Sequence, residues 1–151
     1  MEKTCYELSL TSSYVSNWTF LDAIRELIQN GIDQEIVDST NKFSMTYDEE
    51  RKVIRFVNTK SRLHINTLLL GKTSKAKNDS TVGQFGEGYK IAALVLNRLG
   101  KTFTIYNNAK KELWESRFKN SEKWHDKLLA FYVSKYEPTE NCFVIEVGNV
   151  E

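Results

Sequence analysis

The chain has 151 residues, of which 40% are hydrophobic and 27% are charged, with one proline and seven glycines. This composition excludes a disordered or fibrous protein and predicts one compact, soluble domain that buries about two-thirds of the surface of its unfolded chain. The formal net charge of +1 gives no overall field for nucleic acid or for an anionic membrane.

The first predicted elements are a short strand at 6–10 and a helix from Thr19 to about Glu35. Thr19 and Asp22 have the spacing of a capping box, which marks the start of a helix. A buried stripe is expected from the apolar residues that recur every three or four positions, Leu21, Ile24, Ile28 and Ile32.

Three polar residues of the same helix, Glu26, Asn30 and Asp33, fall at i, i+4 and i+7. They are expected on a second stripe, roughly opposite the apolar one. A solvated helix face is the usual reason for such a stripe. The set also has a chemical interpretation, because a carboxylate can deprotonate a water and an amide oxygen one turn later can help to hold Mg²⁺.

Two strands follow, at 43–47 and 53–57, joined by a hairpin turn at 48–51. A short helix is predicted at 65–70, and the polar stretch at 72–81 is predicted to be a mobile lid. Positive charge is concentrated in this stretch, either on a solvated loop or, as we favour, near phosphates; the residues are Lys72, Lys75 and Lys77.

A glycine-rich turn from Gly83 to Gly88 leads into a helix predicted from about Glu87 to Leu99, which Gly100 ends. Glycine allows the backbone to approach an anion closely, and the free N–H groups of a first helical turn attract one. Taken alone, this turn is more often an ordinary loop than a phosphate site.

The remaining elements are predicted strands at 102–106, 113–118, 128–134 and 143–147. Helices early in the chain and strands late in it indicate an α+β fold. We therefore expect a two-layer sandwich in which helices cover one face of a mixed β-sheet.

The helical segment from Glu26 to Asp33 resembles the N-box of the GHKL ATPases, the superfamily of gyrase, heat-shock-protein-90-type chaperones, histidine kinases and MutL. The stretch from Gly83 to Gly88 resembles the glycine box with which that family closes its ATP lid. The chaperone branch is the most similar, because Leu70 to Lys75 resembles its lid entry and the strands after the glycine box also match. The resemblance covers roughly residues 20 to 147 and implies one ATP-binding domain over 1–151, with the Bergerat fold and a lid at about 71–86.

This resemblance implies ATP and Mg²⁺ as ligands and a role for each matching residue. Glu26 would be the general base for the attacking water, Asn30 would hold Mg²⁺, and Asp33 would support the site. The phosphates would be bound by the glycine box, whose members are Gly83, Gln84, Phe85, Gly86 and Gly88. For Lys90, a solvated helix position is favoured over a role in the site.

The sequence departs from the family where the base of ATP would bind. Asn58 replaces the Asp that accepts a hydrogen bond from adenine, and the glycines expected after it are absent. A neutral acceptor costs on the order of 1 kcal/mol of binding energy, which weakens ATP binding without abolishing it. Lys60 and Arg62 could narrow the base pocket, or Arg62 could contact a phosphate or stack on the base.

Two functions from different classes are consistent with this pattern. The first is a slow Mg-ATPase whose lid ordering controls a protein partner, with a lid-mediated dimer as one form of that control. The second is a degenerate, non-hydrolysing module of the same fold that acts by binding a protein, which Asn58 supports. A histidine-kinase activity is disfavoured, because no helix with a phosphoacceptor histidine precedes the domain.

Other features limit the partners and the compartment. No apolar run approaches the ~20 residues of a membrane helix and the start of the chain does not resemble a secretion signal, so we expect a cytoplasmic protein without a membrane partner. Cys5 and Cys142 are far apart and form no zinc-binding pattern with the histidines, so we expect reduced cysteines. Nothing after Val147 would convert hydrolysis into movement, which favours a separate protein partner or a longer natural chain.

Overall fold

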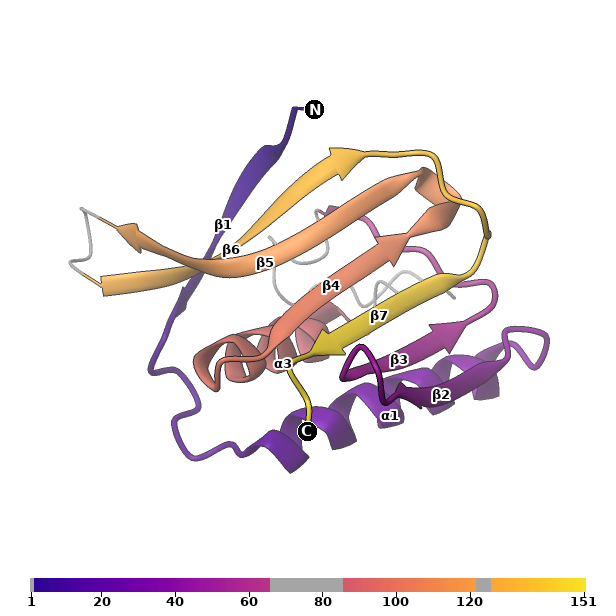
Figure 1. The fold of residues 1–151 in the computed structure, drawn as a ribbon, viewed down its shortest axis with the longest axis horizontal. Coiled ribbons are helices and arrows are strands. Elements are labelled where there is room, and N and C mark those ends of the chain that lie inside the picture. The colour runs from indigo at the N-terminus through magenta and orange to yellow at the C-terminus, as the bar shows by residue number, and fades with distance from the viewer. Residues whose placement is uncertain (1, 66–85, 122–125) are drawn as a thin grey trace.

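The computed structural model describes residues 2–65, 86–121 and 126–151 (Figure 1). This part of the chain forms two α-helices, α1 (Phe20–Val37) and α3 (Gly86–Arg98), and a short 3₁₀ turn at Asn108–Lys110. The strands are β1 (Thr4–Thr11), β2 (Phe43–Asp48), β3 (Val53–Asn58), β4 (Thr102–Asn107), β5 (Glu112–Ser121), β6 (Asp126–Lys135) and β7 (Phe143–Gly148).

The seven strands form one sheet in the order β1-β6-β5-β4-β7-β3-β2. Every neighbouring pair in it is antiparallel. The predicted α+β sandwich with a mixed sheet is therefore wrong: the structure is mostly an antiparallel sheet, with 41% of the described residues in strands and 27% in helices. The two described α-helices lie side by side behind one part of the sheet, and their main contacts with it are to β2, β3, β4 and β5 (Figure 1).

The position of β7 explains why the sheet is antiparallel rather than mixed. The connection from β3 through α3 to β4 makes those two strands run in the same direction, as in a parallel unit. The last strand, β7, lies between them and runs against both, with Phe56 opposite Ile145 on one side and Ile105 opposite Ile145 on the other. The other antiparallel pairs are between strands that follow each other along the chain, β2 with β3, β4 with β5 and β5 with β6, and between β1 and β6, which are far apart in the sequence.

The core lies between the helices and the sheet. Aromatic rings form its centre: Phe131 of β6 makes edge-to-face contacts with Phe103 of β4 at 6.4 Å and with Trp114 of β5 at 6.1 Å between ring centroids. The middle of α3 is fully buried against these strands, from Ala92 to Leu96. This packing fixes the position of α3, and α3 in turn packs along α1.

The start of α1 is as predicted. The Thr19 hydroxyl accepts a hydrogen bond from the Asp22 backbone N–H at 3.2 Å, and the Asp22 carboxylate accepts one from the Thr19 N–H at 2.7 Å, which completes the capping box.

The predicted buried stripe of α1 is wrong at two of its four positions, while Ile24 is buried and Ile28 is half-buried as part of the packing. Leu21 and Ile32 are 62% and 41% exposed, whereas the polar side chain of Asn30 is buried. The helix instead buries a stripe rotated away from the predicted one, made of Ala23, Ile24, Leu27, Asn30, Gly31 and Gln34. Small residues on this stripe allow α1 to approach its neighbours closely.

Gly31 shows how close that approach is. A Cβ atom at this position would lie 2.2 Å and 2.3 Å from two ring carbons of Phe43 in β2. A Gly31→Ala variant is therefore expected to lower the free energy of unfolding by about 1–3 kcal/mol, measured by urea denaturation. Adding Phe43→Leu to Gly31→Ala should recover part of the loss, and an unchanged stability of the single variant would contradict this packing.

The predicted strands are all present, with ends that differ by a few residues, and so are the two long helices. The predicted helix at 65–70 and most of the predicted lid lie outside the described residues. In the described part of the chain, no helix is both long enough and apolar enough to cross a membrane.

Candidate functional site

The packing of α1 against α3 brings the two sequence motifs together. Gly88, in the first turn of α3, lies directly against Glu26 and Asn30 of α1. A Cβ atom at position 88 would be 2.2 Å from Glu26 Oε2 and 2.6 Å from Asn30 Nδ2. Only a residue without a side chain allows the carboxylate, the amide and the first turn of α3 to be this close.

Asn30 has a feature that its packing does not explain. Asn30 is 5% exposed, and its Nδ2 makes no hydrogen bond of good geometry within the described part of the chain, although it lies close enough to the Glu26 carboxylate to lower the pKa of that group. A buried polar group without a partner costs about 1–3 kcal/mol, and such groups are uncommon in native proteins. A half-turn of the amide would present Oδ1 at the same place, so the group can serve as donor or as acceptor to a ligand.

Glu26 is half-buried beside Gly88, and it also reaches solvent. It lines an open depression of about 430 Å³ on the outer side of α1, together with Asn17, Trp18, Asp22, Arg25 and Gln29. Burial raises the pKa of its carboxyl above the ordinary value, and the negative charge of Asp33 raises it further, whereas the Asn30 side chain lowers it. A water-accessible carboxylate of raised basicity is what a general base requires.

No family model matches the chain, and no curated protein matches it.

Two more residues singled out in the sequence lie on the same helices. Asp33, two turns after Glu26, accepts a hydrogen bond from Gln29 Nε2 at 2.8 Å. Its contribution to the site is the charge that it adds near Glu26. Lys90 is 7% exposed, so the expected solvated lysine is wrong.

Asn58, at the end of β3, is buried and lies against α1. Its Nδ2 donates a hydrogen bond to the backbone oxygen of Gly31 at 3.1 Å, one residue from Asn30. Because the nitrogen is used in this way, the Oδ1 of the same amide is the atom that remains to accept from a ligand. The structure thus places Asn58 next to α1, with its amide nitrogen toward the Gly31 backbone oxygen.

The sequence analysis missed a chain of buried polar residues that connects these elements. Gln34 of α1 donates from Nε2 to the hydroxyl of Tyr89 at 2.7 Å and accepts from the hydroxyl of Ser61. Ser61 in turn accepts from Asn41 Nδ2 at 2.9 Å, and Asn41 Oδ1 accepts from the backbone N–H of Lys60 at 2.8 Å. The chain ties the turn that carries Gly88 to the segment after Asn58. No spacing in the sequence signals it, because each residue comes from a different segment.

The rest of the glycine box is only partly within the described residues. Gly86 begins α3 and Gly88 lies in its first turn. The positions of Gly83, Gln84 and Phe85, like the predicted lid up to residue 85, lie outside the described residues.

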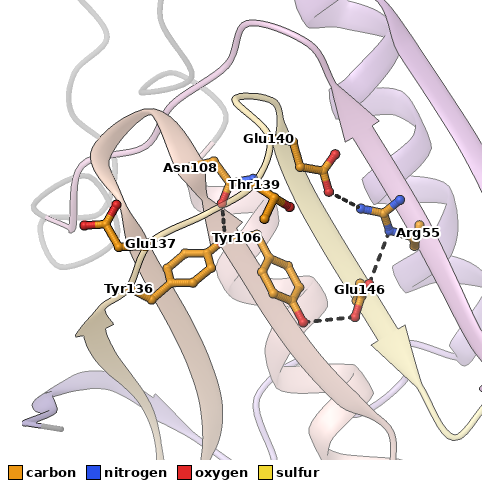
Figure 2. A pocket seen from close by; sticks show the side chains of 8 residues that line it. All are labelled: Arg55, Tyr106, Asn108, Tyr136, Glu137, Thr139, Glu140 and Glu146. Atoms are coloured by element: carbon orange, nitrogen blue, oxygen red, sulfur yellow. Dashed lines mark hydrogen bonds and ion pairs between the residues drawn. The ribbon is translucent and has the colours of Figure 1, made fainter.

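A second concave site lies on the opposite face of the sheet. Arg55 alternates with the core residues Ile54 and Phe56 on β3, so its side chain points away from the helices. The cavity has a volume of about 240 Å³ and is lined by Arg55, Tyr106, Asn108, Tyr136, Glu137, Thr139, Glu140 and Glu146 (Figure 2).

The polar groups of this cavity are paired mainly with one another. Glu146 is 9% exposed and accepts from Arg55 Nε at 3.2 Å, from Arg51 Nη2 at 3.0 Å and from the Tyr106 hydroxyl at 3.2 Å. Burial, and then the charge of Glu146, raise the pKa of Tyr106 to about 12, so its hydroxyl stays protonated and continues to donate. Figure 2 shows the two carboxylates, Glu140 and Glu146, on either side of Arg55. We interpret this cluster as a support of the sheet.

Removal of the central carboxylate tests that interpretation. Glu146→Ala leaves two guanidinium groups and a tyrosine hydroxyl without their shared acceptor, and we expect the free energy of unfolding to fall by about 2 kcal/mol. The matched control is Glu140→Ala, because Glu140 pairs with the same Arg55 but is half-exposed. That variant should lose less than about 1 kcal/mol in the same urea titration. Equal losses would contradict a special role for Glu146.

Proposed function

We propose that this chain binds ATP with Mg²⁺ and hydrolyses it slowly, in the manner of the GHKL ATPases. The observation that supports this most is the contact of Gly88 with both Glu26 and Asn30. Two motifs that are far apart in the sequence, each resembling an ATPase box, meet at the start of a helix. The resemblance implies that the two motifs share one site.

Each residue at this meeting point has a property that suits the proposed role. The backbone N–H groups at the start of α3 can donate to phosphate oxygens, and Gly88 allows Glu26 and Asn30 to lie close beside them. Asn30 offers a buried amide whose nitrogen makes no hydrogen bond of good geometry to the described residues. Glu26 holds a carboxylate of raised pKa, which can accept a proton from a water that enters through the adjoining depression.

The residues present also fit a magnesium ion that is held largely by phosphates and water. Among the described residues, no three His, Cys, Asp or Glu side chains are grouped as a metal site. Mg²⁺ often has only one or two protein ligands in nucleotide sites, so Asn30 suffices as the amide ligand from the protein. When bound, the ion would neutralise phosphate charge and orient the phosphates.

Asn58 is the residue that we propose for contact with the nucleobase. Its amide nitrogen is held by the Gly31 carbonyl oxygen, which leaves the amide oxygen to accept from the amino group of adenine. The proposal includes a protein partner that responds to lid ordering, and a cytoplasmic location. Support for that location comes from the free state of Cys5 and Cys142.

Isothermal titration of ATP, ADP and GTP into the chain, with and without Mg²⁺, tests the proposal directly. We expect binding that is selective for adenine and strengthened by Mg²⁺. No binding at roughly millimolar nucleotide would overturn the proposal and favour the non-hydrolysing module that acts through a protein partner.

The role of Asn30 predicts a specific change in that titration. Asn30→Ala should weaken ATP binding by roughly tenfold or more when Mg²⁺ is present, and leave it nearly unchanged in its absence. Asn97→Ala is the control, because Asn97 lies on α3 with its amide committed to Ala93 O and Ser116 Oγ. An equal loss with and without Mg²⁺ would show that Asn30 does not act through the metal.

A further inference from the structure

The two edges of the sheet differ in how well they are protected against pairing with another strand. At one edge, β1 carries an irregularity in its register between Glu7 and Thr11, and Glu7 forms an ion pair with Lys119 at 2.8 Å. Bulges and charges of this kind are how natural proteins prevent edge-to-edge pairing. At the other edge, β2 pairs with β3 in an unbroken register from Phe43 to Asp48 and contains neither lysine nor proline. Among the described residues, no strand pairs with its outer side.

An exposed apolar surface adjoins this unprotected edge. Met45 and Tyr47 of β2 are each 45% exposed, and they share the face of the sheet on which α1 lies, because Phe43 of the same face contacts Gly31. Gly31 lies on the side of α1 that faces β2. At about 100° per residue, the neighbouring stripe of the helix surface, toward solvent, contains Leu21, Ile28, Ile32 and Ile36. Leu21, Ile32 and Ile36 are 62%, 41% and 74% exposed. Three of the four residues that the sequence predicts to be buried, Leu21, Ile28 and Ile32, lie on this stripe, and the described part of the chain leaves Leu21 and Ile32 exposed.

We infer that a second copy of this chain pairs with β2, so that two sheets join at this edge around a two-fold axis through Met45. In this antiparallel register Met45 lies opposite Met45 of the second copy, and Phe43 lies opposite Tyr47. Lys42 lies opposite Asp48, so the ends of the two strands are complementary in charge. The polar face is also matched, because Ser44 lies opposite Thr46.

The hydrogen-bonding directions of β2 favour the same register. The backbone oxygen of Lys42 accepts from Thr59 N at 3.0 Å, so the backbone groups of residue 42 point toward β3. Directions alternate along a strand, so those of Phe43, Met45 and Tyr47 point outward. These residues are opposite one another in the proposed pair, which gives hydrogen-bonded pairs at the edge. The Phe43 N–H already donates to Glu35 at 2.9 Å, so we expect Met45 and Tyr47 to supply the donors.

Joining the sheets about this axis also brings the two copies of α1 toward each other on one side of the joined sheet. Their exposed stripes would then be covered by the second copy. The apolar surface and the unpaired backbone edge are thus satisfied by one partner, and a two-fold axis makes the same patch serve both copies.

Analytical ultracentrifugation from about 1 μM to about 1 mM chain tests this pairing. We expect a monomer–dimer equilibrium that Met45→Lys weakens by about tenfold or more, because two like charges then face each other across the axis. Leu99→Lys is the matched control: Leu99 is 44% exposed at the end of α3, and its replacement should leave the dimer unchanged. A wild-type chain that stays monomeric throughout, or a dimer that Met45→Lys leaves intact, would overturn the inference.

A cross-linking experiment checks the register itself. In a chain with Cys5→Ser and Cys142→Ser, Met45→Cys should form a disulfide-linked dimer on mild oxidation, because directly opposite residues of a hydrogen-bonded pair have Cα atoms about 5.5 Å apart. Leu99→Cys in the same background should remain unlinked. Equal cross-linking of both variants would mean that random collision links them, and would contradict the proposed axis.

Discussion

Replacement of Glu26 by glutamine is expected to slow ATP hydrolysis by about 10² to 10⁴-fold while leaving the affinity for ATP nearly unchanged. Glutamine keeps the size of the side chain and its place against Gly88, but it cannot accept a proton at pH 7. A general base acts on the transition state far more than on the bound substrate, so turnover falls and binding does not. The measurements are steady-state phosphate release and isothermal titration of ATP.

The pH dependence of ATP turnover by the wild type should reflect the ionisation of the same carboxylate. Burial raises the pKa of Glu26 above its ordinary value. Turnover should therefore rise with pH through a pKa higher than that of a solvent-exposed glutamate, and the Glu26→Gln variant should lack this acid limb.

The stability of the Glu26→Gln variant has an expected sign as well. A carboxyl whose pKa is raised on folding favours the native state only while it is protonated, so its ionisation near neutral pH costs stability. Removal of the charge should raise the temperature of thermal unfolding at pH 7. This difference from wild type should shrink as the pH falls through the raised pKa of Glu26 in the folded chain, and should be absent below the pKa of Glu26 in the unfolded chain.

Glu137→Gln is the control for these measurements, because Glu137 is an exposed carboxylate that pairs with Lys111 on the opposite face of the sheet. It should change neither turnover nor the acid limb. If Glu26→Gln hydrolyses ATP at the wild-type rate, Glu26 is not the base. If the Glu26→Gln variant fails to bind ATP, the carboxylate contributes to ATP binding rather than to the chemical step.

Local patterns predicted the elements of this fold well, for physical reasons. Runs of alternating apolar and polar residues, or of residues that favour strands, located the strands, and the Thr19–Asp22 capping box located the first turn of α1. Such signals involve residues that are close in sequence. Their interactions form independently of how the rest of the chain is arranged. The pairing of Gly88 with Glu26 and Asn30 was anticipated in another way, from the resemblance of two short motifs to one family.

The arrangement of the elements was not predictable in the same way. The antiparallel sheet results from the insertion of β7 between β3 and β4, and the sequence of Phe143 to Gly148 does not say which strands it will join. Every side chain of β7 is buried, including Glu146. A strand that is apolar on both faces indicates a central position, but several positions in a sheet are central.

The orientation of α1 was predicted wrongly for a related reason. The period of Leu21, Ile24, Ile28 and Ile32 is helical, and a monomer is expected to bury its most apolar stripe. The structure buries a neighbouring stripe, which contains Gly31 and allows Phe43 to pack against the helix. If a second copy of the chain covers Ile32, as we infer, the apolar pattern in the sequence reflects an interface between two copies as well as the core of one copy.

Replacement of Gly88 by alanine is expected to slow ATP hydrolysis by about a hundredfold, since small displacements of catalytic groups can have effects of that size. The added Cβ would meet Glu26 Oε2 at 2.2 Å and Asn30 Nδ2 at 2.6 Å. Glu26 is half-buried and can rotate toward solvent, whereas Asn30 is buried and has little room to move. We therefore expect the free energy of unfolding to fall by only about 1–2 kcal/mol, while Mg²⁺-dependent binding weakens through Asn30 and turnover falls through Glu26.

A second glycine separates the effect on stability from the effect on the site. A Cβ atom at Gly148 would lie 2.3 Å from Thr102 Oγ1, which is a collision as close as that at Gly88. Gly148→Ala should destabilise the chain without changing turnover per folded molecule. Similar losses of activity in both alanine variants would mean that the loss at Gly88 reflects unfolding.

The double variant Gly88→Ala with Glu26→Gln shows whether the glycine acts on turnover through the carboxylate. If alanine slows hydrolysis by displacing Glu26, it has little left to displace once position 26 is a glutamine that cannot act as a base. The double variant should then be nearly as active as Glu26→Gln alone, so the two effects are strongly non-additive. Additive effects would instead mean that Gly88 contributes to turnover separately from Glu26, for example through the position of Asn30. The measurement is the turnover, at saturating ATP and Mg²⁺, of the wild type, the two single variants and the double variant. It distinguishes the two roles because only one of them requires the Glu26 carboxylate.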